Sequence, residues 1–191
     1  MRLNIQKKII LLSAAIFLLA CWADNWVNSL YFSSEYSKVL KDEVFVISNT
    51  LKNQLDRLLR MHIPIGQIEG FEELCQAVIT EHTFLSYVMV VDTEGQILFH
   101  NNGSRHGEKI SDPLVLKGIA GLNRSVQHSV VNKEKHYDFF IPVFENGTDH
   151  VATIRTGFPA TFISDKTRQM TQYSLGIAAL FFLIGLLVFL F

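Results

Sequence analysis

Histidines, and the carboxylates that could pair with them, are the side chains most able to do chemistry in this sequence. The chain contains seven histidines, the residue type that exchanges protons near neutral pH and commonly binds metals. Within a single predicted element, no spacing places two of them on one face, so we expect no metal site. His100 with Asp138 is one pair that could perform general acid–base catalysis. The sequence shows no phosphate loop, hydrolase, zinc-protease, dinucleotide, kinase or cyclase motif, and we expect neither enzymatic activity nor a cofactor.

A second group of polar side chains could bind a molecule without reacting with it. Arg105 lies in a polar stretch and is expected to be exposed. Asp138 and Arg155 alternate with apolar neighbours in predicted strands, and for either one alone a surface position is the simpler interpretation. Tyr137 shares a strand face with large apolar neighbours, which indicates a core position or the wall of a pocket.

The hydrophobic pattern predicts the elements that position these residues. Apolar residues three, four and seven apart predict a long helix over residues 30–61, which ends before Pro64, and a shorter helix over 69–82. Asp112 and Pro113 are typical of a helix start, and this short helix should end near residue 120. Apolar runs separated by turns predict five strands, which cover residues 85–92, 96–100, 124–131, 136–144 and 151–158. We therefore expect an α+β fold.

Two apolar segments enclose this region. Residues 9–23 have Ser13 as their only plainly polar member, and residues 175–191 carry no charge. At about 1.5 Å per helical residue, both are somewhat short for a hydrocarbon core of about 30 Å. Basic residues precede the first segment and aromatic residues flank both, as is common at membrane boundaries. We expect two transmembrane helices, a cytoplasmic N-terminus and residues 24–174 outside the cytoplasm.

The N-terminal segment has an alternative interpretation. A basic start followed by an apolar run is also typical of a signal peptide. The residues LLAC at 18–21 resemble a bacterial lipobox, in which Cys21 would be lipidated. An uncleaved anchor is preferred, because a second membrane span makes lipidation redundant. The other cysteine, Cys75, lies in the predicted domain, so a disulfide between the two is not expected.

Charge separates the N-terminus from the rest of the chain. The first eight residues carry three basic residues and no acid, and all 18 acids lie in the middle region against 14 basic residues. That region therefore has a net charge of −4. A mildly acidic surface gives no reason to expect a nucleic-acid partner.

The predicted order, with a helix after the second of five strands, resembles the PAS-like sheet of bacterial extracellular single-Cache domains. These are the sensor domains of sensor kinases, chemoreceptors and diguanylate cyclases. The resemblance covers roughly residues 30–168 and the two flanking spans. It is carried by VMVVDTEGQILFHNN at 88–102, SRHGEKISDP at 104–113, and YDFFIPVF and HVATIRTGF at 137–144 and 150–158.

The resemblance implies a ligand pocket on one face of the sheet. Residues 102–121 and the strands around Tyr137 and Arg155 would form its walls, and ligand binding would displace the last strand and the helix after it. His100 occupies the place of the family's ligand-binding histidine. The ligand-binding residues implied are His100, Arg105, Tyr137, Asp138 and Arg155.

The sequence departs from the members that bind citrate or dicarboxylates. Those members carry one arginine where this chain has Ile97 and another where it has Asp138. Carboxylate ligands are usually held by such charge-assisted pairs, so the departure argues against a di- or tricarboxylate. Arg105 or Arg155 could compensate, or the ligand could be an amine or zwitterion that pairs with Asp138.

We therefore expect a sensing module of a bacterial signal-transduction receptor, anchored in the inner membrane. Residues 1–29 would form the cytoplasmic N-terminus and first span, 30–168 the sensor domain and 169–191 the second span. The expected partners are a small-molecule ligand, the membrane and a second copy of the chain bound through the long N-terminal helix. The alternative is an anchored PAS-like domain that binds another protein and no metabolite.

Overall fold

The computed structural model describes residues 5–131 and 134–190, and its elements follow the predicted order. The chain forms two units: one comprises the beginning of the chain up to Lys38 and its end from Ile163, and the other is Val39–Phe162. The helices are α1 (Ile5–Arg60), α2 (Phe71–Glu81), α3 (Pro113–Ile119) and α4 (Ala160–Leu190). The strands are β1 (Tyr87–Asp92), β2 (Ile97–His100), β3 (Ser125–Val131), β4 (Glu134–Glu145) and β5 (Asp149–Pro159). Short 3-10 turns occur at Ile65–Gln67 and Gly103–Arg105.

The five strands form one antiparallel sheet in the order β2-β1-β5-β4-β3. The predicted strands and helices are confirmed, with ends that differ by a few residues. The predicted long helix and the N-terminal apolar segment lie in one helix, α1. Part of the predicted turn between β3 and β4, residues 132–133, lies outside the described residues.

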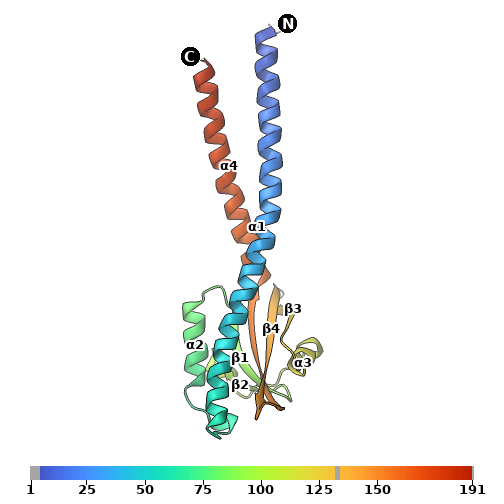
Figure 1. Ribbon diagram of the computed structural model, residues 1–191, viewed down its shortest axis with the longest axis vertical. Coiled ribbons are helices and arrows are strands. Elements are labelled where there is room, and N and C mark those ends of the chain that lie inside the picture. Colours follow the sequence, from blue (N-terminus) through green and yellow to red (C-terminus); the bar gives the residue numbers. More distant parts are fainter. Residues whose placement is uncertain (1–4, 132–133, 191) are drawn as a thin grey trace. The chain divides into compact units, whose positions relative to one another are not determined.

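Helices cover both faces of the sheet (Figure 1), with α2 against β1 and β2 and α3 against β3, β4 and β5. The second half of α1 lies on the same face as α2, and there Phe45 meets Phe139 of β4 edge-on, with ring centroids 5.1 Å apart. On this face the Ser48 hydroxyl lies 2.8 Å from the hydroxyl of Thr156 on β5, and both residues are fully buried. This hydrogen bond satisfies two polar groups inside an apolar interface.

The opposite face is covered by α3, whose sequence explains its position. The Asp112 carboxylate accepts the Leu114 amide and Pro113 occupies the first turn, which confirms the predicted helix start. A Cβ at Gly118 would lie 2.7 Å from the Phe140 ring, so only glycine lets α3 approach β4 this closely. A cluster of buried apolar side chains fills this layer: Tyr87, Met89, Val91, Ile97, Val115, Ile119 and Phe140.

The unit made by the two ends of the chain contains the first part of α1 and most of α4. Phe17 and Phe182 stack with ring centroids 5.8 Å apart, and the hydroxyls of Ser29 and Thr171 lie 3.5 Å apart. Over the described residues, neither helix contains a stretch that is long and apolar enough to count as a membrane span.

Candidate functional site

A cavity of about 340 Å³ lies on the α3 face of the sheet. The strands β1, β2, β3 and β5 contribute to it, together with α3 and the loop that precedes α3. Its lining residues are Tyr87, Met89, Ile97, Arg105, Glu108, Lys109, Ile110, Ser111, Asp112, Val115, Ser129, Val130, Val131 and Arg155. The volume suits a small molecule of the size of a common metabolite.

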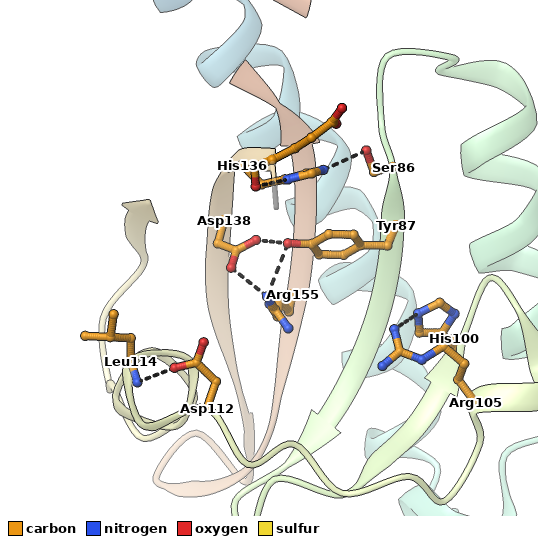
Figure 2. Close-up of polar contacts among 10 residues, drawn as sticks. Ser86, Tyr87, His100, Arg105, Asp112, Leu114, His136, Asp138 and Arg155 are labelled. Atoms are coloured by element: carbon orange, nitrogen blue, oxygen red, sulfur yellow. Dashed lines mark hydrogen bonds and ion pairs between the residues drawn. The ribbon is translucent and has the colours of Figure 1, made fainter. Parts of the chain in front are cut away.

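A buried polar cluster of Tyr87, Asp138 and Arg155 adjoins this cavity (Figure 2). The Arg155 Nη2 atom donates to Asp138 Oδ2 at 2.6 Å and lies 3.2 Å from the Tyr87 hydroxyl. That hydroxyl donates a short hydrogen bond to the other carboxylate oxygen of Asp138. The guanidinium also lies over the Tyr87 and Phe140 rings, at 5.0 and 5.9 Å from their centroids.

The strand register explains why these three side chains meet. Tyr87 and Asp138 flank Gly157 in one row across the sheet, because both residues pair with it. Arg155 lies two residues before Gly157 and points from the same face. A Cβ at position 157 would overlap the Tyr87 ring, so glycine is needed for the tyrosine to cross β5 and reach Asp138.

Burial of this cluster affects its charges. Burial raises the pKa of Asp138 above its ordinary value, and the charge and hydrogen bond of Arg155 oppose this rise. We treat the two groups as an ion pair, because the 2.6 Å contact between them is a charge-assisted hydrogen bond. Removing either partner would leave the other charge buried and uncompensated.

Among the described residues, two buried polar atoms of residues that line the cavity have no hydrogen-bond partner. They are the Nε atom of Arg155 and the Oγ atom of Ser129. A buried polar group without a partner typically costs about 1–3 kcal/mol. Arg155 and Ser129 lie in different rows of the sheet, so they give the cavity wall two separate polar points against an otherwise largely apolar sheet face.

His100 is buried beside this cavity and is neutral at physiological pH. Burial is the main cause that lowers its pKa from 6.5 to about 4, and the charge of Arg105 adds to it while Glu108 opposes it. Its Nδ1 atom accepts the Asn102 amide at 2.8 Å, so the ring proton lies on Nε2. That nitrogen is 3.5 Å from Arg105 Nη1, and two donors therefore face each other. An acceptor placed between them would satisfy both.

The structure brings together four of the five residues that were expected from the sequence to bind the ligand. Arg105 and Arg155 line the cavity, Asp138 is held against Arg155, and His100 contacts Arg105. Tyr137 is the exception. Its ring lies on the α1 face, stacked on Phe158 at 5.2 Å and with the Lys41 ammonium 4.6 Å from its centroid. The expectation that Tyr137 would form a wall of the pocket is therefore wrong, although its predicted place beside apolar neighbours is correct.

Two residues of the site were not found from the sequence. Tyr87 stands in the apolar run of β1, and a buried tyrosine hydroxyl needs a partner, which was the available signal. Ser129 gives no signal at all, because a serine in a strand next to valines is ordinary. To identify either residue as part of the site, one must know which face of the sheet carries the cavity.

In the part of the chain that the structure describes, the polar contacts do not join His100 to Asp138, the pair considered for acid–base catalysis. The Asp138 oxygens bond to Tyr87 and Arg155, and the His100 nitrogens face Asn102 and Arg105. Among the described residues, no three histidine, cysteine or acidic side chains converge as metal ligands. What this arrangement can do is bind a small polar molecule.

Comparison with known proteins identifies the family of the chain. The family model of single cache domain 3 matches residues 62–172, which is more than half of the chain. The chain therefore belongs to the single-Cache domain family, whose members are sensory modules. No curated protein matches the chain.

Solved structures with the same fold are sensor domains. The sensor domain of Escherichia coli DcuS has 15% identity and a TM-score of 0.55 over 69% of this chain and 96% of its own. The sensor domain of the Vibrio cholerae histidine kinase DctB has 16% identity and a TM-score of 0.57 over 72% of this chain and 56% of its own. A domain of a putative sensory box/GGDEF protein of Vibrio parahaemolyticus has 11% identity and a TM-score of 0.50, over 69% and 58%. At these identities the likeness establishes the fold alone.

Proposed function

We propose that this chain is the extracytoplasmic sensing module of a bacterial membrane receptor and that it binds a small molecule in the cavity beside α3. The observation that carries the proposal is the cavity itself, whose lining includes Arg155 and Ser129, each with a buried polar atom that has no partner among the described residues. Membership of the single-Cache family supports the same function. A module that binds only another protein would not need a cavity lined by charged and hydroxyl side chains.

The connection from the cavity to the end of the chain supports signalling. Arg155 of β5 lines the cavity, the strand ends at Pro159, and α4 begins at Ala160 without a linker. A ligand that binds one position of β5 more tightly than another would shift the population of α4 between two arrangements. Sensing and output would thus share one continuous segment of chain.

Membrane anchoring and pairing of two copies are part of the proposal. Large apolar side chains are exposed on the first part of α1 and on α4, among them Leu12, Leu19, Leu180 and Phe181, and such surface usually contacts lipid or protein. We propose spans within residues 1–29 and 169–191 and a sensor domain at 30–168. Val39 and Val46, seven residues apart on α1, are also exposed and could pair with a second copy.

A thermal-shift screen of the full chain against amino acids, amines, polyols and organic acids tests the proposed function. At least one compound should raise the melting temperature Tm. Ser129→Leu, which fills the cavity, should abolish the shift, whereas Ser125→Leu on the same strand but outside the lining should preserve it. A screen without any hit, or a hit that Ser129→Leu leaves unchanged, would remove this cavity as the ligand site.

A further inference from the structure

The two arginines of the cavity lining form ion pairs within the chain. Arg105 donates from Nε to Glu108 Oε2 at 2.8 Å, and Arg155 pairs with Asp138 at 2.6 Å. The remaining charges in the lining are Lys109 and Asp112, which are opposite in sign. Together with Glu108 and Asp138, the charged residues of the lining therefore sum to a net formal charge of zero.

We propose that Asp138 determines ligand specificity: its carboxylate occupies Arg155 from inside the chain, so that the cavity accepts polar ligands without net charge and rejects carboxylates. This inference rests on the proposed function, since it names the class of ligand for the same cavity. The class comprises neutral molecules that carry a carbonyl or hydroxyl oxygen.

The geometry places Asp138 behind Arg155. The carboxylate is fully buried and does not belong to the cavity lining, whereas Arg155 does. The ion pair uses Nη2 of the guanidinium, and among the described residues the Nε–H group has no partner. A neutral oxygen that reached this group would gain a hydrogen bond at little electrostatic cost.

The electrostatic free energy of binding is less favourable for a carboxylate ligand. It would bring a second negative charge to an arginine whose charge Asp138 already compensates. Burying an ion without a partner of opposite charge is strongly unfavourable. The same guanidinium would bind an anion well if Asp138 were absent, because arginine–carboxylate pairs are among the strong hydrogen-bonded interactions.

Two variants of the full chain, Asp138→Ala and Asp138→Asn, test this specificity. The alanine removes the carboxylate and leaves space, and the asparagine removes the charge but keeps the volume. Acetate and acetamide are the probes, because they have nearly the same shape and differ in charge. Asp112→Asn is the matched control: it removes an acid from the same cavity wall while asparagine still caps α3.

Acetate at about 100 mM should raise the Tm of both Asp138 variants by roughly 2–5 °C relative to equal chloride. Acetamide should raise it by less, and neither the wild type nor Asp112→Asn should respond to acetate. If Asp138→Ala folds only in part, acetate should increase its folded fraction and acetamide should not. The additional change Arg155→Met should abolish every response to acetate.

The proposal is overturned if acetate stabilises the Asp138 variants no more than acetamide does, or no more than it stabilises Asp112→Asn. Its failure is distinguishable from failure of the proposed function. If the wild type has a ligand that Ser129→Leu abolishes and the Asp138 variants ignore acetate, only the specificity proposal fails. If the variants bind acetate but no compound binds the wild type, the sensing proposal fails and the role of Asp138 stands.

Discussion

Asp138 on β4 and Arg155 on β5 form an ion pair with 2.6 Å between Oδ2 and Nη2, on the sheet face that carries the cavity. Neither residue is displaced from its strand to do so, because both point from the same face and lie one pleat apart in adjacent strands. The pair joins the two central features of the account, since Arg155 lines the cavity and lies on the strand that leads into α4.

Breaking this pair should cost much stability. Asp138→Asn leaves the buried Arg155 charge without a counter-charge, and such changes destabilise by about 3–5 kcal/mol. Glu108→Gln breaks the more exposed pair with Arg105 and should cost less than about 1 kcal/mol. Chemical denaturation of both variants measures the difference in unfolding free energy. Equal losses in the two variants would show that the buried pair has no special role.

Gly157→Ala should disturb the same cluster from the β5 backbone. The new methyl group overlaps the Tyr87 ring, and overpacking of this kind costs about 1–3 kcal/mol. Gly66→Ala is the control, because nothing lies within 4 Å of a Cβ there and its φ is not positive. Thermal unfolding should separate the two, and a Gly157→Ala variant as stable as Gly66→Ala would contradict the packing of Tyr87 over Gly157.

The hydrogen bond between Ser48 of α1 and Thr156 of β5 can be tested by a double-mutant cycle. Ser48→Ala or Thr156→Val alone leaves the other residue's buried hydroxyl without its partner. Each single change should therefore cost about 1–3 kcal/mol. The double variant should cost clearly less than the sum of the two, because it leaves neither hydroxyl behind. Losses that simply add would mean that the two hydroxyls do not interact.

His100 should make stability depend on pH. Its pKa falls from 6.5 in the unfolded chain to about 4 in the fold, so the unfolded state binds the proton more readily between these values. The stability that neutral His100 contributes is present above pH 6.5 and is lost as the pH falls towards 4. His100→Gln should therefore flatten the fall in unfolding free energy over this range relative to the wild-type protein. If the unfolding free energy of His100→Gln depended on pH as in the wild-type protein, the lowered pKa of His100 would be refuted.

The sequence predicted the fold well because its signals are local. Apolar spacing located α1, and Asp112 with Pro113 located the start of α3. Strand alternation also grouped Tyr137 correctly with its apolar neighbours, but it could not tell which sheet face would carry the cavity. The answer depends on how the helices cover the sheet, which is set by packing between distant segments.

The pairing of Asp138 with Arg155 was beyond the sequence for a related reason. It requires the register that places Asp138 opposite Gly157, and a shift in that register between Val143 and Phe144 intervenes before the turn. A slip of one residue would send one of the two side chains to the other face. Separate interpretations of the two residues as surface positions were therefore wrong, because each is buried by the other.

Calorimetric titration of the best compound from the ligand screen into the full chain and into Ser129→Leu is the decisive test of the ligand site. We predict one bound molecule per chain in the wild-type protein, no net charge on that molecule at neutral pH, and at least a tenfold loss of affinity in the variant, or about 1.4 kcal/mol. Equal affinity in both proteins would contradict the claim that the cavity beside α3 is where this domain senses its ligand.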